Sequence, residues 1–226
     1  MKFDVLTLFP EMFDGLTKSI IGKARERKLI DINLINIRDF SNDKHKKVDD
    51  TPYSGGAGMV IRPDVVYSAY LSVKDKNAKV IYLSPQGNTL NQTKVEELSK
   101  EKHLILLCGH YEGIDQRILD EIVDEEISIG DYVLTGGEIP AMVLIDSVSR
   151  YIDGVINKNS ISEETFANGL LEYPQYTRPE IFLGKKVPDV LLSGHHENIK
   201  KWRNQVSLQI TKNKRPDLLK KEGGYQ

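Results

Sequence analysis

The stretch SIGDYVLTGGEIP, residues 128–140, places three glycines, two carboxylates and a proline between two apolar segments. Glycine-rich turns often cradle phosphate, but that use requires backbone N–H groups with a cation beside the anion. Here the fixed charges, Asp131 and Glu138, have the opposite sign. The stretch therefore predicts a loop for a ligand that is largely neutral or partly cationic, unless its glycines only close tight turns.

Two further loops follow apolar runs, SPQGN at 84–88 and GHYEGID at 109–115. Because the carboxyl ends of parallel strands meet at one edge of a sheet, we expect all three loops to converge on one crevice. None of them contains G-x-G-x-x-G, G-x-x-x-x-G-K-[ST] or a lysine, which argues against a dinucleotide or a nucleoside triphosphate. A flat heterocycle with a ribose and a cationic part would suit them, as in S-adenosylmethionine.

The elements that must position these loops alternate along the chain, apolar segments with amphipathic ones. We expect strands at 3–9, 31–37, 79–84, 103–108 and 126–130, and helices at 13–27, 62–73, 91–101, 115–126 and 139–152. Pro63 and Pro140 fall in first turns, where proline is tolerated. The pattern predicts an α/β fold with a parallel sheet, then a polar linker and a mainly helical remainder whose last helix begins at Pro216.

Composition narrows the class of protein. The chain has 226 residues, 39% hydrophobic and 28% charged, which is an ordinary globular composition. It has no apolar run near the roughly 18 residues of a membrane span and no signal-peptide pattern, so we expect a cytoplasmic location. Cys108 lies in an apolar run, and we interpret it as a core residue.

Charge is polarised along the chain. The net charge is only −2, yet residues 199–221 contain eight lysines or arginines against one aspartate. A basic segment on an otherwise acidic protein indicates an anionic partner, RNA or DNA in preference to a membrane. A solvated helix surface is the alternative interpretation.

Seven blocks, taken together, carry a resemblance over nearly the whole chain. In order they are LTLFPEMF, DKHKKVDDTPYSGGAGMV, YLSPQGNTLNQ, GHYEGIDQR, SIGDYVLTGGEIPAMVLIDSVSR, GLLEYPQYTRPE and VLLSGHHENIKKWR. They closely resemble the bacterial tRNA (guanine-N1)-methyltransferase family, TrmD. The resemblance implies an α/β fold of the SPOUT class with a deep trefoil knot on the C-terminal side, a homodimer, and methylation of the guanosine immediately 3′ of the tRNA anticodon.

The resemblance also implies how the chain is divided into domains. Residues 1–156 would form the knotted domain that binds S-adenosylmethionine, 157–168 a flexible linker, and 169–226 a helical tRNA-binding domain. The family's positions for the methyl donor fall here on Tyr82, Leu83, Ser84, Pro85, Gly109, Tyr111, Glu112, Gly113, Ile129, Gly130, Tyr132, Leu134, Gly136, Gly137 and Pro140. These positions lie in the three loops singled out above, whose glycines would let the backbone approach the donor.

Methylation of guanine N1 requires a carboxylate that accepts the N1 proton and a cationic donor at O6. Arg150 resembles the family's arginine in the second role. Glu164 stands where the family has an aspartate, and we expect it to be the general base, with Glu163 as the fallback. This departure favours one rival interpretation, a catalytically weak tRNA-binding SPOUT protein.

The resemblance places a basic loop beside the target guanosine, with His45 and Asp50 as contacts, and it assigns phosphate contacts to Lys200, Lys201 and Arg203. We therefore expect tRNA and a second copy of the chain as partners, and neither DNA nor a membrane.

Adjacent His195 and His196 lack a third ligand at suitable spacing, so we predict no protein-built metal site. Mg²⁺ remains a candidate cofactor that the resemblance implies. Two other rivals are a SPOUT methyltransferase for a different RNA position and a Rossmann oxidoreductase, which lacks its fingerprint here.

Overall fold

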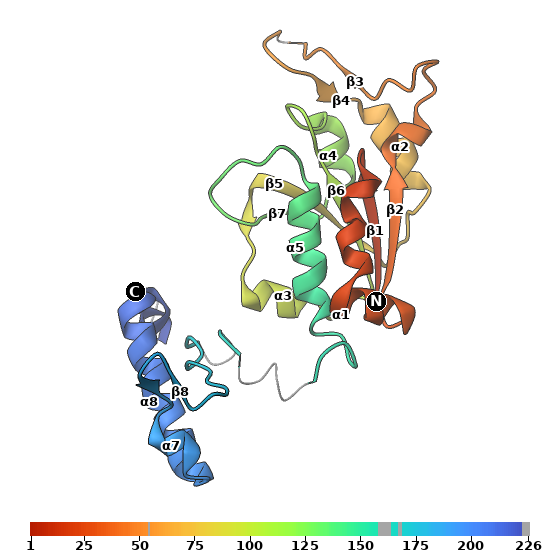
Figure 1. Ribbon diagram of the computed structural model, residues 1–226. Helices are drawn as coiled ribbons and strands as arrows, with labels where there is room; N and C mark the ends of the chain where they lie inside the picture. The colour runs from red at the N-terminus through yellow and green to blue at the C-terminus, as the bar shows by residue number, and fades with distance from the viewer. Residues whose placement is uncertain (54, 158–163, 167–168, 223–226) are drawn as a thin grey trace. The chain divides into compact units, whose positions relative to one another are not determined.

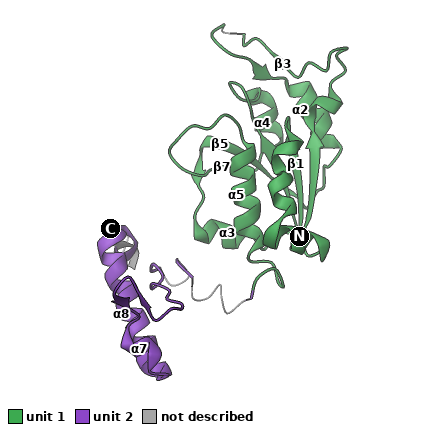
Figure 2. Ribbon diagram, in the orientation of Figure 1, with its two compact units in different colours: residues 1–156 green, residues 157–226 purple. Residues whose placement is uncertain are grey.

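The computed structural model describes residues 1–53, 55–157, 164–166 and 169–222. The chain divides into two compact units, which we call unit 1 (residues 1–156) and unit 2 (residues 157–226) (Figure 2). No helix in the described part of the chain is long and apolar enough to cross a membrane.

A five-stranded sheet forms the centre of unit 1, and all its neighbouring strands are parallel (Figure 1). Its order is β2-β1-β6-β5-β7. The strands are β1 (Lys2–Thr7), β2 (Asp31–Asn36), β5 (Lys79–Thr89), β6 (His103–Cys108) and β7 (Glu125–Ser128). Every residue of the central strand β6 is buried, as expected for a parallel sheet covered on both faces. The prediction of an α/β fold with a parallel sheet is confirmed.

Helices cover both faces of this sheet, each over its own apolar core (Figure 1). One face carries η1 (Pro10–Thr17), α1 (Ser19–Glu26), α3 (Gln92–Leu98) and α5 (Glu138–Ser149). The other carries η2 (Ile37–Phe40), α2 (Pro63–Leu71) and α4 (Gln116–Ile122). Pro63 and Pro140 lie in first turns, as predicted. Cys108 is fully buried, and this burial raises the pKa of its thiol well above the ordinary value, so the prediction of a core residue is confirmed.

Three predicted boundaries were wrong for identifiable reasons. The helix expected at 13–27 is a 3₁₀ helix and an α-helix, because Lys18 is extended and Ser19 has φ of 55°. The helix expected at 115–126 ends at Ile122, where the chain turns into β7 and Asp124 accepts a hydrogen bond from Val80 N. The run SPQGN lies inside β5, whose register against β7 shifts between Leu83 and Asn88.

A long segment between η2 and α2 projects from the sheet and holds the antiparallel pair β3 (Asp49–Asp50) and β4 (Val60–Ile61) (Figure 1). Backbone hydrogen bonds fasten it to the loop after β6: Ile61 N donates to Gly113 O at 3.0 Å, and Glu112 N donates to Met59 O at 2.9 Å. The basic loop is thereby tied to the same edge of the sheet as the glycine-rich loops.

Unit 2 contains a hairpin and helices. Its elements are β8 (Ile181–Phe182), β9 (Lys185–Lys186), α7 (Asp189–Leu192), α8 (His196–Lys214) and η3 (Pro216–Glu222). The last helix begins at Pro216, as predicted, and it is a 3₁₀ helix. The hairpin was not predicted, although Leu183 and Gly184 both have positive φ, the conformation that a two-residue hairpin turn requires.

Candidate functional site

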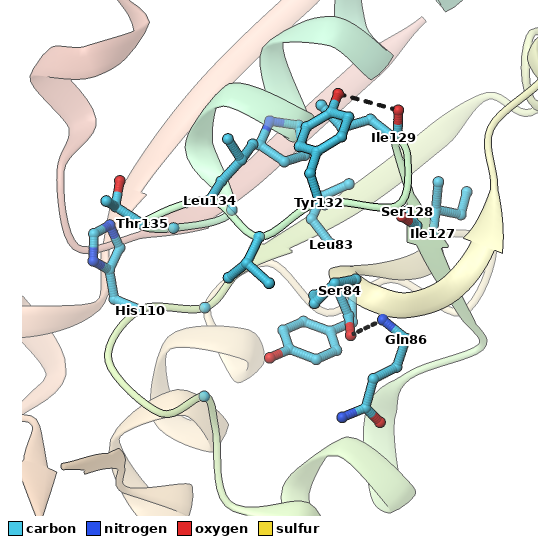
Figure 3. Close-up of a pocket in the computed structure, with 18 of the residues that line it drawn as sticks. Leu83, Ser84, Gln86, His110, Ile127, Ser128, Ile129, Tyr132, Leu134 and Thr135 are labelled. Carbon is cyan, nitrogen blue, oxygen red and sulfur yellow. Dashed lines mark hydrogen bonds between the residues drawn. The ribbon is translucent and has the colours of Figure 1, made fainter. Parts of the chain in front are cut away.

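A cavity of about 250 Å³ lies outside the carboxyl edge of the sheet, where the three glycine-rich loops meet (Figure 3). Its lining includes all fifteen positions that the sequence assigned to the methyl donor. Six further residues line it that were not predicted: Gln86, His110, Ile127, Ser128, Val133 and Thr135. The expected convergence of the three loops is therefore present in the structure, because parallel strands deliver their carboxyl ends to one edge.

Hydrogen bonds between residues of the same loop hold the conformation of the loop that follows β7. Gly130 N donates to Ser128 Oγ at 3.1 Å, and Tyr132 N donates to Gly130 O at 2.9 Å. The Tyr132 hydroxyl donates to Ile129 O at 3.3 Å, which folds its ring over the loop (Figure 3). At its far end the loop joins the one after β6, because Gly137 N donates to Gly109 O at 2.9 Å and residues 110 and 136 form a β-bridge.

The glycines of the cavity are required by packing between protein segments. A Cβ on Gly137 would lie 2.7 Å from Cys108 Cα, and one on Gly109 would lie 2.8 Å from the Tyr82 hydroxyl oxygen. A Cβ on Gly130, whose φ is +147°, would meet the Tyr132 ring at 2.6 Å. Gly109 and Gly137 let different loops approach one another, and Gly130 lets Tyr132 fold over its own loop. The sequence interpretation had attributed these glycines to the approach of a ligand.

The two carboxylates of the opening stretch differ sharply in environment. Asp131 is exposed, whereas Glu138 is fully buried at the first residue of α5. The Glu138 carboxylate accepts a hydrogen bond from the Thr7 hydroxyl at 2.7 Å and is hydrogen-bonded to His110 Nε2 at 2.9 Å. Both carboxylates were predicted to favour a partly cationic ligand, but Glu138 does not line the cavity, and its oxygens are already bonded to Thr7 and His110.

Apolar and aromatic side chains supply the walls of the cavity, with Leu83, Ile129 and Leu134 among them (Figure 3). Tyr82 is largely buried between the loops, and this burial, assisted by the charge of Glu126, raises its pKa to about 12. Its phenol therefore stays protonated and can donate a hydrogen bond at neutral pH. Such walls with polar backbone between them suit a flat heterocycle.

The two residues assigned to catalysis lie in different units. Arg150 follows the last residue of α5, the helix whose first turn reaches the cavity through Pro140. Glu164 belongs to unit 2, where it lines a second cavity of about 900 Å³ that also contains Lys200 and Arg203. Glu163, the fallback base, lies outside the described residues.

The residues assigned to RNA lie on exposed or half-exposed surface. His45 is exposed, and the pKa of the exposed Asp50 is lowered, first by a hydrogen bond from Thr51 N and then by Lys47. Lys200 and Lys201 are exposed on α8, and the Arg203 guanidinium stacks on the Tyr173 ring with 4.5 Å to its centroid. The described residues contain no group of three or more His, Cys, Asp or Glu side chains that could hold a metal ion.

An all-parallel sheet with a ligand cavity at its carboxyl edge places the chain among α/β proteins that bind a small molecule through glycine-rich loops. A family model described as tRNA (Guanine-1)-methyltransferase TrmD matches residues 1–221, and the chain belongs to this family. It is therefore an enzyme of the methyltransferase class.

Curated relatives agree with this assignment. A protein of Ruminiclostridium cellulolyticum called tRNA (guanine-N(1)-)-methyltransferase is 62% identical over 226 residues, which cover 98% of this chain and 97% of the relative. Proteins of the same name from Alkaliphilus oremlandii and Clostridium tetani are each 59% identical, and the matches cover 97% of this chain and 92% of each relative.

Proposed function

We propose that this enzyme transfers the methyl group of S-adenosylmethionine to N1 of the guanosine immediately 3′ of the tRNA anticodon. The observation that carries the proposal is the cavity, which collects all fifteen donor positions of the family from three loops. Family membership over residues 1–221 supplies the reaction class and the tRNA substrate. The proposal includes a SPOUT-type knot in unit 1 and a cytoplasmic location, where tRNA is found. It also includes Mg²⁺ as a candidate cofactor.

The residues of the cavity fit the chemistry of this donor. Leu83, Ile129 and Leu134 offer an apolar surface for the adenine, and the surrounding backbone offers N–H and C=O groups for its edges and for the ribose. Exposed Asp131 and Glu112 lie on the same loops and favour a cationic ligand over a phosphate. When bound, the donor supplies a methyl group activated by its sulfonium.

Glu164 and Arg150 supply the remaining chemistry. As guanine N1 attacks the methyl carbon, the bond from that carbon to sulfur breaks and N1 must lose its proton. Glu164 accepts this proton, and Arg150 stabilises the negative charge that develops on O6. Glutamate extends one methylene further than aspartate, so its carboxylate can perform the same role from a backbone position further from the base.

The length of α5 supports a site built from two copies of the chain. Pro140 lines the cavity and Arg150 lies ten residues further along, so about 15 Å separates their Cα atoms at 1.5 Å per residue. This is longer than an arginine side chain can span. A second copy, packed against the apolar side chains that α5 and the neighbouring η1 expose, would bring its own arginine to the cavity. The exposed side chains are Ile139, Val143 and Met12.

Unit 2 is the proposed tRNA-binding domain, covering 169–226, and 157–168 is the proposed linker. Lys200 and Lys201 present positive charge on α8, where they can contact phosphates. His45 and Asp50, on the loop fastened beside the cavity, are the proposed contacts to the target guanosine. That base lies in a single-stranded loop, so it can leave its stack and present N1.

The deciding measurement is transfer of a labelled methyl group to unmodified tRNA. Wild-type enzyme should modify the transcript, and replacement of the target guanosine by adenosine should abolish the label. Glu164→Gln should lower kcat by about a hundredfold with unchanged donor binding, because a general base contributes roughly 10²–10⁴-fold. Full activity in Glu164→Gln with none in Glu163→Gln would reassign the base. Donor binding without any transfer by the wild type would favour the rival, a tRNA-binding protein with weak catalysis.

Composite sites can be tested by mixing two inactive variants. Arg150→Ala removes the arginine, and Leu134→Arg fills the cavity from an exposed position. If each site takes its cavity and its arginine from different copies, co-expression should restore about one quarter of wild-type activity, since half the dimers are mixed and each has one intact site. No recovery in mixed dimers would show that the arginine acts within its own chain.

A further inference from the structure

A chain of three hydrogen-bonded side chains, two of them fully buried, adjoins the cavity. Thr7 ends β1, Glu138 begins α5, and His110 lies in the loop after β6. Thr7 and Glu138 are both 0% exposed, and the Thr7 hydroxyl donates to one carboxylate oxygen while His110 Nε2 is bonded to the other. The Glu138 carboxylate thus joins His110 to Thr7, which lies 131 positions before Glu138 in the sequence.

His110 is the member of this chain that reaches the cavity. The residue lines the cavity, and its ring packs against Phe9, with 4.7 Å between ring centroids. Phe9 is in turn fixed by a hydrogen bond from its N–H to the Thr7 hydroxyl oxygen at 3.0 Å. Neither Thr7 nor Glu138 lines the cavity, so both can influence a ligand there only through other residues.

The same carboxylate determines where the last loop of the cavity runs. A Cβ on Gly136 would lie 2.2 Å from His110 Nε2 and 2.5 Å from a Glu138 oxygen. The backbone at 136 therefore rests directly on the histidine–carboxylate pair. If His110 or this backbone moved away, the buried Glu138 carboxylate would lose a hydrogen-bond partner. Leaving a buried charge without its partner is costly in free energy.

We propose that Glu138 and Thr7 are positioning residues for the methyl donor: they hold His110 and the backbone of residues 136–137 in the geometry that the donor requires. The inference rests on the proposed function, because it assigns the cavity to the donor. A preformed cavity spares the donor the cost of ordering these loops on binding. The pair therefore contributes to donor affinity and not to tRNA affinity.

Donor affinity and steady-state kinetics of three variants test this assignment. Glu138→Gln keeps the shape of the side chain but changes its bond to His110, and we expect the Kd and KM for S-adenosylmethionine to rise about tenfold, the effect of one disturbed buried hydrogen bond. The KM for tRNA and kcat should stay within about threefold of wild type. Thr7→Val removes the hydroxyl at nearly constant shape and should weaken donor binding in the same direction, whereas Thr7→Ser should restore it.

Glu121→Gln, the same chemical change at an exposed position of α4, is the matched control and should leave donor binding unchanged. If Glu138→Gln and Thr7→Val melt at lower temperature yet bind the donor as wild type does, the chain of side chains is merely structural and the inference fails. If Glu138→Gln does not fold, the Thr7→Val and Thr7→Ser pair decides. Loss of donor binding in the wild type would instead overturn the proposed function.

Discussion

Unit 1 and unit 2 are stabilised in different ways. All the buried apolar side chains among the described residues lie in unit 1, where they form two cores against the faces of the sheet. The buried side chains described in unit 2 are those of Ser207 and Thr211, while Ile181, Phe182 and Leu183 are more than half exposed. Unit 1 can therefore hold a preformed cavity by its own packing, whereas unit 2 leaves apolar side chains exposed.

The largest effect should come from a close approach inside unit 1. Gly137→Ala would place a Cβ 2.7 Å from the backbone of Cys108, so one of the two loops must move and the cavity must change shape. We expect methyl transfer to fall more than about tenfold, with a lower melting temperature.

Gly184→Ala in unit 2 is the matched control for that change. A Cβ there meets nothing within 4 Å, although the φ of +74° makes alanine locally strained. Its methyl transfer should stay within about twofold of wild type. Equal losses in the two variants would contradict the contrast between a tightly packed unit and an open one.

The second prediction compares leucines of the two units by chemical unfolding. Leu106 is fully buried in the central strand, so Leu106→Ala should lower the free energy of unfolding by about 2–5 kcal/mol. Leu208 is 39% exposed on α8, and Leu208→Ala should cost less than about 1 kcal/mol. A small cost at Leu106 would show that unit 1 does not depend on its sheet core.

Much of unit 1 was predictable because local patterns and the sheet agree. Runs such as LILLC specify buried parallel strands, and glycine-rich loops after these runs must share one edge. The fifteen positions that the family resemblance assigned to the donor lie in these loops, and they line one cavity. The environment of Glu138 was not predictable, since its partner Thr7 lies 131 positions away in sequence. A buried acid directly after two glycines has no local signature that distinguishes it from an exposed one.

Unit 2 was harder to predict for a different reason. Its hairpin strands have two residues each and its side chains are mostly exposed, so no alternation of buried and exposed positions marks them. Both turn residues, Leu183 and Gly184, have positive φ in the structure, but the pair Leu-Gly lacks the Asn or Asp that marks such a turn in a sequence. The break between η1 and α1 was hidden in the same way, because the left-handed conformation falls on Ser19 rather than on a glycine.

The third prediction concerns the attachment of the segment that carries Glu164. Thr211 is fully buried on α8, where its hydroxyl oxygen accepts a hydrogen bond from Leu171 N at 2.9 Å and its hydroxyl donates to Ser207 O at 2.7 Å. Thr211→Val removes both bonds, at a cost of about 1 kcal/mol. Because Glu172 N also donates to Thr165 Oγ1, the loss should loosen the residues next to Glu164.

We therefore expect Thr211→Val to lower kcat several-fold with an unchanged KM for the methyl donor, and Thr211→Ser to restore kcat. This is the reverse of the pattern expected for Glu138→Gln, which acts within unit 1. A higher donor KM in Thr211→Val would mean that the two units do not divide the donor and base functions between them.

The smallest effect should come from charge pairs at the rim of unit 1. Partial burial raises the pKa of Glu125, but hydrogen bonds from Lys79 and Lys94, at 2.7 and 2.9 Å, lower it overall. A carboxylate whose pKa is lowered by folding contributes stability above its unfolded pKa, and this contribution is lost as pH falls through the folded value. Stability at neutral pH should therefore drop by less than about 1 kcal/mol in Glu125→Gln, since the lysines are partly exposed.

The decisive readout is the slope of stability against pH between about pH 5 and pH 2, where the wild type should lose stability more steeply than Glu125→Gln. Asp189→Asn is the matched variant in unit 2, where Asp189 pairs with Lys186 at 2.7 Å on an exposed surface. Solvent screens that pair, so its removal should leave the free energy of unfolding at neutral pH nearly unchanged. Equal slopes for wild type and Glu125→Gln would show that the rim pairs of unit 1 are screened as fully as those of unit 2.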